Sequence, residues 1–196
     1  MSKFFAEIIS LVFNPLVVLI PIPFFLVFET GGNLMEAIIW TFLSLFFVFL
    51  FFLFILFGIK KGFFSDLDVS RRTQRPLLFS SAIILTIIYI ALLYFLHGPV
   101  ILYIGALSIV VGLFVVDLVN RVIKASVHLA TISALLTFLV LVEGRLFILG
   151  FILIPLLAWS RIKTKNHTLQ ETIIGTSLGI LLTITIYVIF KYIIHV

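Results

Sequence analysis

The chain has no cysteine and few charged residues. Of its 196 residues none is Cys, and Asp, Glu, Lys and Arg together make up 11%. Without cysteine, neither a disulfide framework nor a thiolate metal site can form. So small a charged fraction, beside 63% hydrophobic residues, excludes a water-soluble globular domain. These scarcities predict an integral membrane protein that lies in a lipid bilayer.

Linker sequences are also missing. No Gly/Ser-rich or Pro-rich stretch divides the chain, which predicts a single domain over residues 1–196. The first apolar run contains Pro15, Pro21 and Pro23, and no small-residue cleavage site follows it. We therefore interpret this run as a retained first span and not as a signal peptide.

Long apolar segments are what the chain has in abundance. About 20 apolar residues are needed to cross the hydrocarbon core of a bilayer. The first segment, broken by its prolines, can instead be an interfacial stretch followed by a span, and the short sixth segment is expected to extend into the loop after it. The predicted fold is all-α, a polytopic transmembrane helical bundle of six or seven spans. The segments are 5–28, 37–59, 77–95, 100–119, 125–142, 146–159 and 172–190.

The basic residues lie in short loops between these segments. If every segment crosses the membrane, the polar loops at 60–76, 120–124 and 160–171 fall on one side. All Lys and Arg residues except Arg145 and Lys191 lie on that side. The positive-inside rule makes this side cytoplasmic. The net charge of +5 is explained by membrane orientation and an anionic ligand, and nucleic acid is not an expected partner.

Three polar motifs occur in these loops. Arg75-Pro76 ends the first loop, and Ser126 and His128 begin the fifth segment. The third loop contains Ser160-Arg161, five further residues, His167, three further residues and Glu171. Three ordered motifs on one membrane face form a stronger signal than any one of them alone.

In this order the motifs resemble those of the type 2 phosphatidic acid phosphatase superfamily. That family has a Lys six residues before Arg-Pro, then Pro-Ser-Gly-His, then Ser-Arg followed by His and Asp. The resemblance covers residues 68–171, so the motifs of the predicted domain are 68–76, 124–128 and 160–171. Here Asp68 stands in place of the family's Lys, Ala125-Ser126-Val127-His128 replaces Pro-Ser-Gly-His, and Glu171 replaces Asp.

The resemblance implies a multi-pass phosphatase in the cell membrane that acts on a lipid phosphate or an isoprenoid diphosphate without a metal or cofactor. It implies that His167 attacks phosphorus and becomes a phosphohistidine, that Glu171 orients it, and that His128 gives a proton to the leaving alkoxide. Small bacterial members carry this site on the outer face, the opposite orientation to that indicated by the charges. The implied phosphate-binding residues are Arg75, Arg161, Ser126, Lys124 and Ser160.

Structural interpretations compete with these roles. Thr168-Leu169-Gln170-Glu171 has the pattern of a capping box, in which Glu171 reaches back to a backbone N–H at the start of the last helix. His128 can be a core histidine bonded to a neighbouring helix. Asp117 and Arg121 are four residues apart, which predicts an ion pair on one helix face.

Two other functions fit parts of the sequence. Ser65-Asp66-Leu67-Asp68, followed by basic residues, is similar to one magnesium loop of membrane prenyltransferases, which need two such loops. Asp68 and Val127 also allow a catalytically inactive protein that binds or transports lipid phosphates on the same scaffold.

Overall fold

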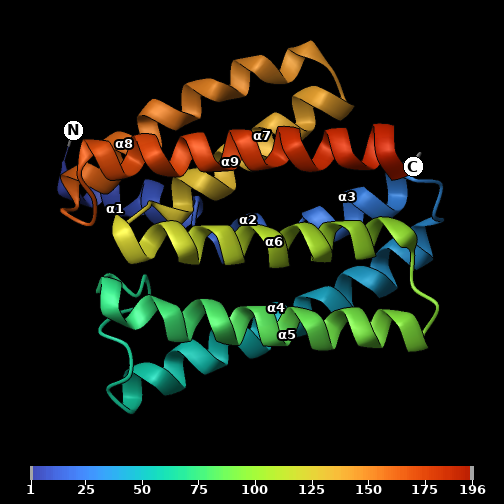
Figure 1. Ribbon diagram of the computed structural model, residues 1–196, viewed down its shortest axis with the longest axis horizontal. Coiled ribbons are helices and arrows are strands. Elements are labelled where there is room, and N and C mark those ends of the chain that lie inside the picture. The colour runs from blue at the N-terminus through green and yellow to red at the C-terminus, as the bar shows by residue number, and fades with distance from the viewer. Residues whose placement is uncertain (1, 195–196) are drawn as a thin grey trace. The chain divides into compact units, whose positions relative to one another are not determined.

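The computed structural model describes residues 2–194, which form helices and no strand (Figure 1). Contacts divide the chain into two compact units. Unit 1 contains Met1–Val18 and Val122–Val196, and unit 2 contains Leu19–Arg121. The single domain remains a prediction, because two compact units can belong to one domain.

Unit 2 contains four main helices. They are α3 (Ile22–Glu29), α4 (Leu34–Lys60), α5 (Arg75–Phe95) and α6 (Val100–Val122), with a 3₁₀ turn at Arg72–Gln74 before α5. A capping box begins α4, since Asn33 Oδ1 accepts the Glu36 N–H at 2.9 Å and Glu36 Oε2 accepts the Asn33 N–H at 3.1 Å. The core of this unit joins its helices through the buried side chains of Val27, Ala37, Leu93 and Leu102.

Unit 1 contains the second and third motifs. Its helices are α1 (Lys3–Val12), α2 (Pro15–Val18), α7 (Val127–Val142), α8 (Leu153–Lys163) and α9 (Leu169–Ile189), with a 3₁₀ stretch at Arg145–Ile152 and a π-helical end at Phe190–Ile194. Helix α9 lies along α7 (Figure 1). A Cβ added at Gly175 would lie closer than 3.0 Å to the backbone of Ser126, just before α7, and one at Gly179 as close to the backbone of α7 itself. The two glycines therefore allow this close approach. Ser133 Oγ also donates to the Thr176 carbonyl of α9 at 3.0 Å.

The apolar helices suit a lipid bilayer. Within residues 2–194, five helices are long and apolar enough to cross a membrane, and a sixth is obtained if Lys3–Val12 and Pro15–Glu29 are counted as one bent span. The first predicted segment is broken into α1, α2 and α3 around its prolines. The sixth predicted segment extends into the loop after it, as expected, because the apolar stretch continues to Lys163. The fifth forms only the 16-residue helix α7.

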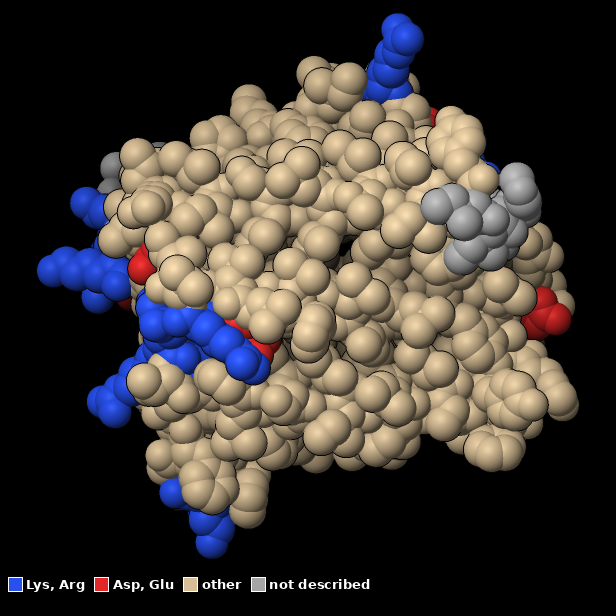
Figure 2. Space-filling model, viewed as in Figure 1, with Lys and Arg blue, Asp and Glu red and all other residues tan. Residues whose placement is uncertain are grey.

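Uncharged side chains cover most of the surface visible in Figure 2. The predicted Asp117–Arg121 ion pair is confirmed in α6, with Nη2 and Oδ2 3.0 Å apart. The placement of all three polar loops on one side of the membrane involves both units and remains a prediction.

Candidate functional site

The loop between α8 and α9 has a fixed backbone. The N–H of Lys165 donates to the Ile162 carbonyl at 2.9 Å, and the N–H groups of Asn166 and His167 both donate to the Arg161 carbonyl at 3.1 Å. This pattern is a Schellman motif, and Lys165 occupies its left-handed position with φ of +60°. Because the Arg161 carbonyl accepts the His167 N–H, the motif fixes the position of the His167 main chain, from which the imidazole extends.

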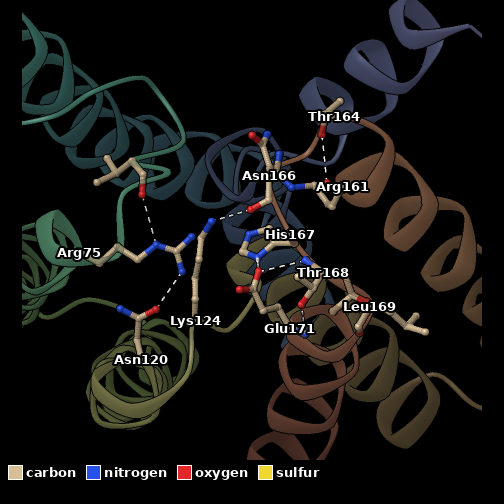
Figure 3. Close-up of polar contacts among 12 residues, drawn as sticks. Arg75, Asn120, Lys124, Arg161, Thr164, Asn166, His167, Thr168, Leu169 and Glu171 are labelled. Carbon is tan, nitrogen blue, oxygen red and sulfur yellow. Dashed lines mark hydrogen bonds and ion pairs between the residues drawn. The ribbon is translucent and has the colours of Figure 1, made fainter.

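The His167 side chain is bound to Glu171 (Figure 3). Its Nδ1 lies 2.8 Å from Glu171 Oε2, and His167 is only 6% exposed. The same Oε2 accepts the Thr168 N–H at 3.2 Å, while Thr168 Oγ1 accepts the Glu171 N–H at 3.3 Å. The capping box and the orienting carboxylate were alternatives in the sequence, and both are present in the structure. An ionised carboxylate accepts hydrogen bonds only, so Nδ1 carries the proton and, in a neutral ring, Nε2 carries the lone pair.

The second motif lies beside the third within unit 1. The Ser126 N–H donates to the Glu171 carbonyl at 3.1 Å, which places the first turn of α7 against the first turn of α9. Lys124 Nζ donates to the Asn166 carbonyl at 2.6 Å (Figure 3). Two motifs that are far apart in the sequence are therefore brought together by bonds to main-chain oxygens.

Ser126 is the N-cap residue of α7, but its side chain does not cap the helix. It is fully buried, and its Oγ has no hydrogen-bond partner among the residues that the structure describes. A buried hydroxyl without a partner is costly, and a helix N-terminus offers N–H groups and a positive dipole to an anion. His128 follows in the first turn of α7 and is 5% exposed.

Ser160 and Arg161 lie at the interface between α8 and α1. Ser160 Oγ donates to the Ala6 carbonyl at 2.6 Å, and Arg161 Nη1 donates to Ser10 Oγ. Both residues are buried, with Arg161 1% exposed. These contacts were not predicted, since nothing in the sequence relates α1 to the third motif.

Arg75 belongs to unit 2, at the first residue of α5. Its Nε donates to the Val69 carbonyl at 3.3 Å and its Nη1 to Asn120 Oδ1 at 3.0 Å (Figure 3), and the side chain is buried. Arg72 Nη2 donates to the Arg121 carbonyl at 2.7 Å. The first polar loop is thus joined to the end of α6. Asn120 was missed by the sequence analysis, although a polar residue at the end of an apolar segment was a usable signal.

Asp66, a possible magnesium ligand in the prenyltransferase interpretation, is engaged in its own loop. Its carboxylate accepts hydrogen bonds from the N–H groups of Asp68 and Ser70 and from the hydroxyls of Ser65 and Ser70, at 2.6 to 3.1 Å. Partial burial acts to raise the pKa of Asp66, but these bonds outweigh it and hold the pKa below its usual value. Asp66 therefore organises the loop before Arg75.

A shallow apolar groove runs along α8, beside the loop between α8 and α9. Its volume is about 380 Å³, and its only charged lining residue is Lys163. The groove ends at Leu169, two residues from both His167 and Glu171 in the sequence. The lining residues are Pro155, Ala158, Trp159, Ile162, Lys163 and Leu169.

Within residues 2–194, no three or more His, Asp or Glu side chains gather in a way that would hold a metal ion. Comparisons of the chain with models of known protein families, with curated proteins and with solved structures find no match.

Proposed function

We propose that this chain is a phosphatase of the cell membrane that hydrolyses a lipid phosphate or an isoprenoid diphosphate through a phosphohistidine. The observation that carries the proposal is the hydrogen bond between the buried His167 and the half-buried Glu171, with Nδ1 and Oε2 2.8 Å apart. A carboxylate on Nδ1 fixes the tautomer and stabilises the positive charge that the ring acquires when Nε2 forms a bond.

The reaction has two steps. In the first, the Nε2 lone pair of His167 attacks phosphorus, the bond from phosphorus to the leaving oxygen breaks, and His128 gives that oxygen a proton. In the second, water attacks the phosphohistidine, loses its proton to His128, and releases phosphate with neutral His167. For a diphosphate substrate the leaving group is a monophosphate instead of an alcohol.

The substrate phosphate is bound in this proposal at the first turn of α7. The unpartnered Ser126 Oγ and the adjacent N–H groups support this assignment. Lys124, Ser160 and Arg161 complete the set in unit 1. The role of Arg75 rests on the resemblance of the sequence motifs alone.

A lipid substrate is favoured over a soluble one. The groove on α8 is almost wholly apolar and ends near the catalytic loop, so it suits a hydrocarbon tail. Lys163, which is among its lining residues, suits an anionic head group.

Phosphate release from phosphatidic acid in detergent micelles, with and without EDTA, tests the proposal. Turnover is expected to survive EDTA and to be lost in His167→Ala and in His128→Ala. His97→Ala is the matched control, because His97 lies in the turn between α5 and α6, and it is expected to keep full turnover. Full turnover in His167→Ala, or an absolute need for magnesium, would contradict the mechanism.

One observation favours a second candidate, a lipid-phosphate binding or transport protein without turnover. Two of the expected phosphate-binding residues, Ser160 and Arg161, already bond to α1. Binding of phosphatidic acid with no phosphate release from either substrate class would establish this alternative.

A further inference from the structure

Helix α1 presents one polar side chain to α8. Its buried residues are Ala6, Ile9 and Ser10, whereas Phe4 and Leu11 are exposed. Helix α1 packs against α8. A hydroxyl on a buried, otherwise apolar face is costly unless it is hydrogen-bonded, so Ser10 calls for an explanation that the three motifs do not provide.

The partner of Ser10 is Arg161. Ser10 Oγ accepts a hydrogen bond from Arg161 Nη1, with Ser10 8% and Arg161 1% exposed. One helical turn earlier on α1, the Ala6 carbonyl accepts from Ser160 Oγ at 2.6 Å. Helix α1 therefore contacts the Ser-Arg pair at two points, and at one of them it holds the guanidinium itself.

Arg161 in turn is connected to His167. Its carbonyl accepts the N–H groups of Asn166 and His167, so its main chain and its side chain are both fixed. Ser10 Oγ is a neutral acceptor, and its bond orients the guanidinium without cancelling its charge. An arginine loses considerable side-chain entropy when it is immobilised, and an arginine that is already held pays less of that cost when it binds an anion.

We propose that Ser10 is a positioning residue for phosphate binding, which holds the Arg161 guanidinium in the orientation that receives a phosphoryl oxygen. This inference rests on the proposed function and extends its site to a helix outside the motifs.

The test compares the unaltered protein with Ser10→Ala and Ser10→Thr in detergent. Calorimetry measures the Kd of orthovanadate, phosphate release from phosphatidic acid gives kcat and KM, and thermal unfolding gives Tm. Removing a hydrogen bond to a charged group is expected to raise the vanadate Kd and the KM about tenfold in Ser10→Ala. The Tm of Ser10→Ala is expected to fall, because a buried guanidinium N–H loses its acceptor, while kcat changes little. Ser10→Thr, which keeps the hydroxyl, is expected to restore both the Kd and the Tm.

Ser108→Ala is the matched control. Ser108 Oγ donates to the Ile104 carbonyl of its own helix at 2.7 Å. The vanadate Kd of Ser108→Ala should therefore equal that of the unaltered protein. If Ser10→Ala folds poorly, Ser10→Cys fills the same space with a weak acceptor and gives the same comparison.

The outcomes separate the two proposals. Unaltered protein that neither binds vanadate nor releases phosphate would overturn the proposed function and this inference with it. An unchanged Kd in a folded Ser10→Ala, or a lowered Tm with no recovery of Kd in Ser10→Thr, would overturn the role of Ser10 alone.

Discussion

At the scale of single residues, Glu171 performs two tasks with one oxygen. Its Oε2 caps α9 through the Thr168 N–H and also bonds His167 Nδ1. The sequence presents these tasks as alternatives because a capping box and a His-carboxylate pair use the same four-residue spacing. Only the side-chain geometry shows that one rotamer satisfies both.

Because Glu171 both caps α9 and bonds His167, we expect Glu171→Gln and Glu171→Ala to differ in their effects on turnover and Tm. Gln keeps an acceptor at the third helical position but lacks the charge that fixes the His167 tautomer, so turnover should fall about 10⁴-fold while the Tm changes little. Ala also loses the cap, which costs about 1 kcal/mol of stability. Phosphate release and thermal unfolding of both variants measure the two effects. Equal Tm losses in Gln and Ala would show that the cap requires the charge.

Lys165 is strained in the Schellman motif, because its φ of +60° suits glycine. We expect Lys165→Gly to stabilise the protein by up to about 1 kcal/mol. Lys163→Gly removes the same side chain from the last turn of α8, where glycine is a poor helix former, and should destabilise it. The two Tm shifts, measured under one detergent condition, should have opposite signs.

At the scale of helices, the pair α7 and α9 depends on missing side chains. Gly175→Ala would force its Cβ against the Ser126 backbone, at the site itself. Overpacking of this kind costs about 1 to 3 kcal/mol. Gly112→Ala is the control, since a Cβ there has nothing within 4 Å and the better helix propensity of Ala should preserve or raise the Tm. A Gly175→Ala variant as stable as the unaltered protein would contradict the close packing.

The loop before α5 should respond to acid through Asp66. A folded pKa below the usual 3.8 means that the carboxylate stabilises the fold above pH 3.8 and loses this effect as the pH falls through the folded pKa. Asp66→Ala should therefore lower the Tm at pH 7 and much less at strongly acid pH. The Tm of both the unaltered protein and the variant, measured from pH 7 to strongly acid pH, tests this expectation, and an equal Tm loss at every pH would contradict it.

The positions of the long helices could be predicted from the lengths of the apolar segments, but the breaks within a segment could not. The predicted segments 37–59 and 100–119 correspond to α4 and α6, because long apolar runs admit no other structure in a bilayer. In the first segment the positions of Pro15, Pro21 and Pro23 indicated a break without showing that three helices result.

At the scale of the whole molecule, long-range contacts escaped prediction. The order of the motifs indicated that Ser126 and Glu171 share a site, and the bond between their main chains in unit 1 agrees with it. The contacts of Ser10 with Arg161 and of Asn120 with Arg75 depend on how helices pack, which has no local sequence signature.

The absence of cysteine makes topology directly measurable. The stretch Arg145–Lys163 is long enough to span the membrane, so residues just beyond its two ends should lie on opposite sides. In intact cells, a membrane-impermeant maleimide should label either Glu143→Cys or Lys165→Cys, but not both. Labelling of both variants would show that this stretch does not cross. If only one is labelled, that variant identifies the side that carries the loop between α8 and α9.

The dependence of α7 on α9 has a consequence for biosynthesis. During synthesis, α7 leaves the ribosome before α9 exists, yet it is shorter than the usual span and carries His128, Ser133 and Thr137 among its buried residues. A nascent chain that ends before α9 lacks the acceptor for the Ser133 hydroxyl and the carbonyl that receives the Ser126 N–H. Because these bonds to α9 are missing until it is made, we expect α7 to reach its final packing only afterwards, and chains truncated before α9 to be recognised as misfolded and degraded.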